Sequence, residues 1–224
     1  MSNINDLPVL EYLRTTFQRH RIQMGNRITA VAQGRSSVET ATIQRYMDRF
    51  EALEKEVACE IAETVKDHEM WPWFKSVKGI GPGLAGCLLA HVDIEKANSV
   101  SALWKYAGMG VTDGEHDRPR KGEKLPYNAE LKRICYLIGT SFLKSNSPYR
   151  AEYDEAKAYY QRAKTDWAPK RIDAAARRKM VKLFLSHFWV AYREKRGLPV
   201  RQPYAMQVLN HDGYKSPDEY LLGL

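Results

Sequence analysis

The chain has 224 residues, 44 % of them apolar, and a net charge of +8. This length fits one large domain or a domain with a helical extension, and no apolar run is long enough to predict a membrane-spanning helix. Cys59, Cys87 and Cys135 are odd in number and far apart, which argues against a disulfide framework or a cysteine-based zinc site. Because the N-terminus lacks a signal-peptide pattern, the sequence predicts a cytoplasmic protein.

The charge is unevenly distributed along the chain. Residues 1–70 carry 9 Lys and Arg against 11 Asp and Glu, whereas residues 71–224 carry 26 against 16. A basic part joined to a nearly neutral part is typical of proteins that bind polyanions such as nucleic acids. The charge alone is a weak indication, since many basic proteins bind no nucleic acid.

Two long helices are predicted at the start of the chain. Apolar residues spaced by three, four and seven predict a helix over 8–33, which Gly34 ends. A second helix runs to about Glu69 along a heptad-like seam that Glu54 interrupts. Residues 1–70 therefore form a predicted antiparallel helical arm, either a dimerisation or positioning arm or two ordinary packed helices. The apolar seam residues are Ile43, Met47, Phe50, Val57 and Ile61.

The stretch from Val77 to Val92 reads VKGIGPGLAGCLLAHV and predicts a tight turn between two helices. Its glycines allow a close backbone turn, and Pro82 suits the first turn of a helix. This pattern resembles a helix-hairpin-helix element, in which bare backbone N–H groups and a helix N-terminus approach a phosphate. A plain turn between core helices is the alternative. The predicted DNA-binding residues here are Lys75, Lys78, Gly79, Ile80, Gly81 and Gly83.

The segments on either side of the hairpin have simpler interpretations. The aromatic run 70–74 is expected to pack in the core rather than stack on bases. Residues 108–126 form a predicted polar loop after a short helix that ends at Tyr106. Its acidic half suggests a metal site only weakly, because adjacent residues on a loop rarely converge on one ion. We therefore expect no metal and no cofactor. The candidate phosphate contacts of the loop are Arg118, Arg120, Lys121 and Lys124, and a solvated loop without a ligand is the alternative.

The rest of the chain is predicted to be helical over 128–144, 148–164 and 170–196, and Gly197 ends the last helix. That helix has an apolar face from Ile172 to Ala191 that includes His187, while basic residues lie on its opposite side. This basic stripe is a candidate track for a phosphate backbone: Arg171, Arg178 and Lys182. Residues 198–224 are predicted to be an irregular tail with one short helix.

The order of these features resembles the C-terminal, transposase-domain half of the DEDD-type, bridge-RNA-guided insertion-sequence transposases. The resemblance covers residues 10–196 and rests on FKSVKGIGPGLAGCLLAHV, on SALWKYAGMGV and on the final basic and apolar helix. It implies an all-α fold: a helical arm over 1–70, a helix-hairpin-helix DNA-binding domain over 71–197 and a tail over 198–224. It also implies a mobile element or phage as the origin of the protein.

Two departures from that family concern its chemistry. The first 70 residues show no strand pattern for the family's N-terminal nuclease-like domain, which we expect to be absent. The family's recombining serine lies in the loop after the Ala107-Gly108 break, where this chain has Thr112 and no serine between Ser101 and Ser141. A covalent mechanism needs a nucleophile. Hairpin-containing DNA glycosylases fit no better, because Gly83 and Ser101 stand near the places of their lysine and aspartate.

The sequence therefore predicts a DNA-binding protein without catalytic residues of its own, whose partner is duplex DNA. Three alternatives stay open: a recombinase subunit that acts with a separate catalytic chain, a binder of structured RNA, and an interaction protein that dimerises through its arm. None of them involves a membrane.

Overall fold

The structure is a computed structural model that describes residues 4–112, 115–116, 119, 121–200 and 217–221. Among the described residues, the regular secondary structure is helical except for one antiparallel pair of two-residue strands, so the predicted all-α class is confirmed. The chain divides into two compact units, Met1–His68 and Glu69–Leu224. No helix in the described ranges is both long and apolar enough to cross a membrane.

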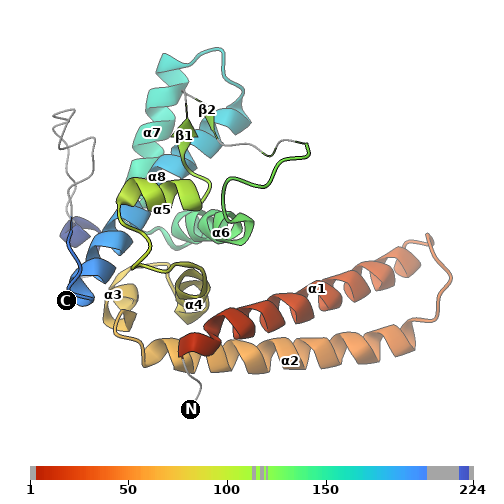
Figure 1. The fold of residues 1–224 in the computed structure, drawn as a ribbon. Helices are drawn as coiled ribbons and strands as arrows, with labels where there is room; N and C mark the ends of the chain where they lie inside the picture. Colours follow the sequence, from red (N-terminus) through yellow and green to blue (C-terminus); the bar gives the residue numbers. More distant parts are fainter. Residues whose placement is uncertain (1–3, 113–114, 117–118, 120, 201–216, 222–224) are drawn as a thin grey trace. The chain divides into compact units, whose positions relative to one another are not determined.

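The first unit is a helical hairpin. A short 3-10 helix η1 (Ile4–Asp6) leads into α1 (Leu7–Ala32), and α2 (Thr40–Lys66) returns antiparallel along it (Figure 1). The Phe17 and Phe50 rings lie 6.2 Å apart across the pair, and the His20 ring stacks on Phe50 at 5.2 Å. The apolar seam of α2 therefore packs on α1 of the same chain.

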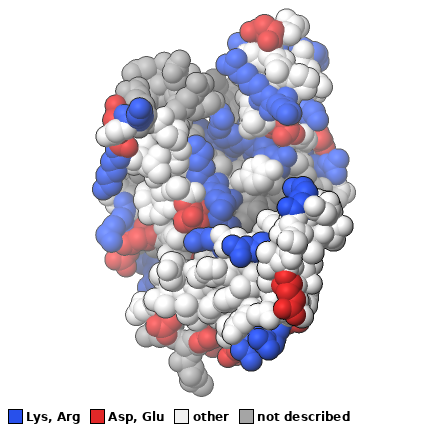
Figure 2. Space-filling model, turned by 90° about the vertical axis from the view of Figure 1, so that its right-hand side faces the viewer, with Lys and Arg blue, Asp and Glu red and all other residues white. Residues whose placement is uncertain are grey.

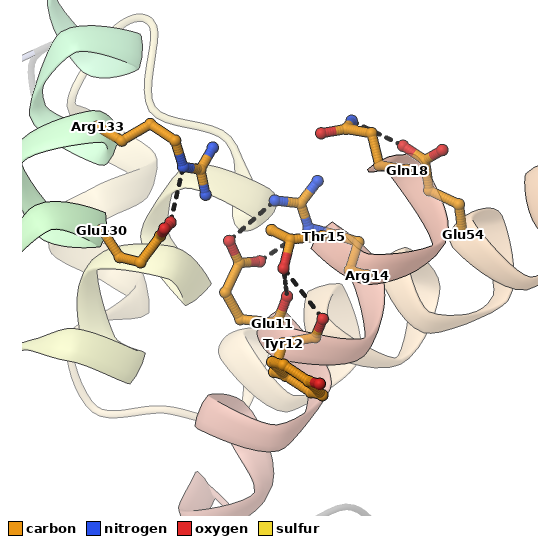
Figure 3. A network of polar contacts seen from close by, with 8 residues as sticks. All are labelled: Glu11, Tyr12, Arg14, Thr15, Gln18, Glu54, Glu130 and Arg133. Atoms are coloured by element: carbon orange, nitrogen blue, oxygen red, sulfur yellow. Dashed lines mark hydrogen bonds and ion pairs between the residues drawn. The ribbon is translucent and has the colours of Figure 1, made fainter. Parts of the chain in front are cut away.

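Glu54, the polar interruption of this seam, has a clear partner. Its carboxylate accepts a hydrogen bond from Gln18 Nε2 at 2.8 Å (Figure 3) and another from Arg21 Nε at 2.7 Å. Both donors lie on α1. Close to the start of α1, Arg14 forms a bidentate salt bridge with the buried Glu11. Its Nε donates to Oε2 at 2.8 Å and its Nη2 donates to Oε1 at 3.0 Å. Polar residues on buried faces need such partners, because an unpaired buried charge is costly.

The second unit is built on the long helix α8, which contacts both α7 and α5 (Figure 1). Short helices come first, and the strand pair lies between α5 and α6. The bounds are α3 (Trp71–Ser76), α4 (Pro82–His91), α5 (Val100–Tyr106), β1 (Val111–Thr112), β2 (Glu115–His116), α6 (Ala129–Ser145), α7 (Arg150–Ala163), α8 (Pro169–Lys195) and the 3-10 helix η2 (Pro217–Tyr220).

An aromatic cluster forms the core of this unit. Phe184 on α8 contacts Phe142 on α6 edge to face, with ring centroids 5.2 Å apart, and Trp73 on α3 stacks on Phe184 at 5.8 Å. Phe74 stacks on Phe188 of α8 at 5.6 Å and is fully buried. The prediction that the aromatic run 70–74 packs in the core is confirmed for Met70 and Phe74, while Trp71 and Trp73 are half-buried and Pro72 is exposed.

Helix α8 buries more residues than the single apolar face predicted from the sequence. Its C-terminal half buries residues around most of its circumference, because α5, α6 and α7 all pack on it. Trp189 donates from its indole N–H to the Ala97 carbonyl at 2.6 Å, and the buried Arg193 donates to the carbonyls of Ile94 and Ala97. These bonds attach the connection between α4 and α5 to α8.

The 3-10 helix η2 contributes one residue to the core. Tyr220 is 5 % exposed, stacks on Tyr149 with ring centroids 4.7 Å apart, and donates a hydrogen bond to the buried Glu152. The Tyr149 hydroxyl in turn bonds to Nδ1 of the buried His187 at 2.7 Å. His187 is therefore a satisfied core histidine.

We predict that Glu54→Ala destabilises the first unit by about 1 kcal/mol, because it removes two hydrogen bonds to a largely buried carboxylate. Thermal unfolding followed by circular dichroism measures this effect. The matched control is Glu51→Ala, which breaks the exposed pair with Lys55 and should leave the melting temperature almost unchanged. Equal effects of the two changes would contradict the packing of Glu54 on α1.

We predict that only one of the three cysteines reacts with a thiol reagent in the native protein. Cys59 is exposed, whereas Cys87 and Cys135 are buried, and burial raises the pKa of Cys135 to about 12. The thiolate is the reactive form, so Cys135 stays protonated at neutral pH. Titration of native protein with a chromogenic disulfide should release one equivalent of chromophore. Cys59→Ser should abolish that release. Rapid labelling of a cysteine in the native variant would contradict the burial of Cys87 and Cys135.

Candidate nucleic-acid interface

The predicted turn is present between α3 and α4. Helix α3 ends at Ser76, Ile80 is buried, and Gly81 stands at the N-cap of α4 with Pro82 as its first residue. Gly79 between them has φ +100°, a backbone conformation that side chains disfavour. The expectation that Pro82 stands in the first turn of a helix is thus confirmed.

Gly79 is held against α6 by a close backbone contact. A Cβ at this position would lie 2.6 Å from Ser145 Oγ and 3.1 Å from the Phe142 ring, and the Ser141 hydroxyl donates to the Gly79 carbonyl at 2.6 Å. Sequence analysis did not find these positioning residues. They are separated from the turn by about sixty positions, and the serines alone give no signal.

Gly81 and Gly83 differ from Gly79, because a Cβ on either would meet nothing within 4 Å. Both are exposed, and the fold itself therefore gives no packing reason for glycine at these positions. The first-turn N–H groups of a helix have no intrahelical acceptor, and they carry the positive end of its dipole. Lys75 near the end of α3 and Lys78 in the bend are both exposed. This surface is bare backbone with two nearby cations.

The predicted polar loop is only partly described. Arg118 and Arg120 lie outside the described residues, while Lys121 and Lys124 are exposed. The strands β1 and β2 pair Val111 with His116, so part of this segment is a short β-hairpin rather than a loop throughout. Within the described ranges, no group of three His, Cys, Asp or Glu side chains is placed to hold a metal ion.

The predicted basic stripe of α8 is not an exposed track. Arg171 is exposed and lies over the Trp167 ring at 4.2 Å, but Arg178 and Lys182 are half-buried. Lys182 Nζ lies 4.0 Å from the Trp104 ring, and burial lowers the pKa of both Arg178 and Lys182. These two residues are therefore less exposed than a surface stripe would be, and at Lys182 the reason is α5, whose Trp104 indole donates to the Lys182 carbonyl.

Basic side chains are nevertheless widespread on the molecular surface. On the face shown in Figure 2, Lys and Arg gather in several groups, and Asp and Glu occupy smaller areas.

Cys135 and Tyr149 are buried groups with a raised pKa. In both cases the main cause is desolvation in the core, so the raised pKa reflects packing and does not indicate a reactive site.

Comparison of the chain with models of protein families, with curated proteins and with solved structures gave no match in any of the three. The relation to the transposase family therefore stays a prediction that rests on the sequence motifs. The candidate interface rests on the geometry of the turn.

We predict that Gly79→Ala destabilises the protein by about 3 kcal/mol, because it combines a disfavoured positive φ with overpacking against α6. Chemical denaturation measures this cost. Gly197→Ala is the matched control, since Gly197 has φ +61° but no atom within 4 Å of an added Cβ, and its cost should be only about 1 kcal/mol. A Gly79 variant no less stable than the Gly197 variant would contradict the close contact with α6.

Proposed function

We propose that the protein binds duplex DNA through the phosphate backbone, with the α3–α4 turn as the central contact and without catalysis of its own. The observation that carries this proposal is the exposed, open backbone at Gly81 and Gly83, where side chains would fit the fold but would stand between the backbone and a ligand. The resemblance of the sequence motifs to those of transposases is the basis for proposing an origin in a mobile element or phage.

The geometry supplies the means of holding a phosphate. Helix α4 is 10 residues long and starts at Pro82, so its first-turn amides and dipole favour an anion at Gly81 and Gly83. Lys75 and Lys78 add positive charge from the end of α3 and from the bend. Amides and lysines of this kind contact phosphates rather than base edges, and the binding is therefore mainly independent of sequence.

Further basic residues extend the surface away from the turn. Lys121, Lys124 and Arg171 are exposed, and Arg118 and Arg120 belong to the same proposal from sequence alone. The excess of 26 Lys and Arg over 16 Asp and Glu in residues 71–224 gives this part of the chain a long-range attraction for polyanions.

The test is a fluorescence-anisotropy titration of labelled duplex DNA at several salt concentrations. We expect the logarithm of the association constant to fall with the logarithm of salt by about 0.9 for each phosphate contacted. Gly81→Val should weaken binding roughly tenfold, since it blocks charge-assisted amide contacts, while the melting curve stays cooperative. The control Gly197→Ala, far along the sequence from the turn, should bind like wild type.

Other outcomes would identify the alternatives. Tight binding by Gly81→Val would exclude the turn as the contact. Tighter binding of a folded RNA than of duplex DNA would favour an RNA partner, and strand transfer that requires an added catalytic chain would favour a recombinase subunit. No binding to either nucleic acid at low salt would contradict the proposal as a whole.

A further inference from the structure

A surface hollow of about 370 Å³ lies beside the hairpin turn. Lys78 contributes to it from the turn, Asn146 and Ser147 from the end of α6, and Arg150 and Asp154 from the start of α7. Asn146 has φ +52° and ends α6 in the left-handed conformation, which brings the chain directly into α7. Three elements therefore meet at this hollow.

Ser147 lines the hollow and has an unused hydroxyl. The residue is 3 % exposed, and its Oγ has no hydrogen-bond partner among the described residues. The neighbouring Ser145 Oγ, which lies against Gly79, is likewise buried and unpartnered there. Buried polar groups in native proteins nearly always have a partner, so such a hydroxyl calls for an explanation.

The first turn of α7 carries charges of both signs, Arg150 and the buried Glu152, whose carboxylate accepts a hydrogen bond from Tyr220. Arg150 is its first residue, and a cation at that end is disfavoured by the helix dipole. An anion held there would be stabilised by the dipole and by Arg150 together. Lys78 is exposed and also lines the hollow, so it adds a second cation.

The present partners of Arg150 are weak. Its Nε lies 3.4 Å from Asp154 Oδ2, and its Nη1 lies 3.4 Å from the Leu143 carbonyl oxygen. Both distances are longer than those of typical charge-assisted hydrogen bonds. The side chains of Arg150 and Asp154 are both exposed by more than two fifths, so the pair is readily exchanged for a stronger anion.

We propose that this hollow is a second phosphate site, which binds a phosphodiester group of the nucleic-acid backbone. Arg150 and Lys78 supply the charge, the start of α7 supplies its dipole, and Ser147 donates its hydroxyl after rotation about its Cα–Cβ bond. This inference rests on the proposed DNA binding and extends it from the hairpin turn to α7. Lys78 belongs to both contacts.

The test uses the full chain and the duplex titration described above. Arg150→Gln should weaken binding about tenfold and reduce the salt slope by about 0.9, because one phosphate contact is lost. The matched control is Arg162→Gln, which removes the same charge from the last turn of the same helix, at an exposed position outside the hollow. It should change binding much less and leave the slope nearly intact.

The outcomes separate the two proposals. If wild type binds and Arg150→Gln behaves like Arg162→Gln, the second site is excluded and the hairpin contact stands. If wild type binds no duplex, the proposed function fails and the phosphodiester site fails with it.

Ser147→Ala provides an independent readout. Its hydroxyl caps no described group, so the melting temperature should stay within about 2 °C of wild type while binding weakens severalfold. A clear loss of stability with unchanged binding would show that the hydroxyl serves the fold, and would remove Ser147 from the site.

Discussion

The close approach of Gly79 to α6 is the contact on which the candidate interface depends. The carbonyl of Gly79 is bonded to Ser141, and its Cα side has no room for a Cβ against Ser145 and Phe142. The same helix ends at Asn146 and leads into α7, so α6 sets the position of the turn and of the start of α7 at once. Because Phe142 also packs on Phe184, the aromatic core supports this arrangement from behind.

Most of the fold could be predicted because local signals and periodicity agree. Pro82 begins α4, the cap Asn128 precedes α6 with its side chain bonded to the Leu131 N–H, and Gly197 follows α8. Periodicity fails where burial is not one-sided, as on α8, whose C-terminal half is covered by several helices. Periodicity also predicts that Glu54 interrupts the apolar seam of α2. In the structure its carboxylate pairs with Arg21 of α1, so Glu54 contributes to the contact between the two helices.

The candidate site is less predictable, since it depends on contacts between distant residues. Glycine spacing identifies the turn, but it does not separate Gly79, which the fold requires, from Gly81, which the fold leaves open. Helical spacing places Lys182 on a polar stripe, and only the packing of Trp104 shows that this amine is half-buried. Arg150 has a local signal, a cation at a helix start, which has meaning only beside the hollow.

The burial of Tyr220 has a consequence for synthesis of the protein. Its hydroxyl bonds to Glu152, 68 positions earlier, and its ring covers Tyr149. Because α7 and α8 precede Tyr220 in the chain, the part of the Tyr149 ring that Tyr220 covers stays open during synthesis until Tyr220 has left the ribosome. Until then the second unit exposes an aromatic surface of the kind that chaperones recognise.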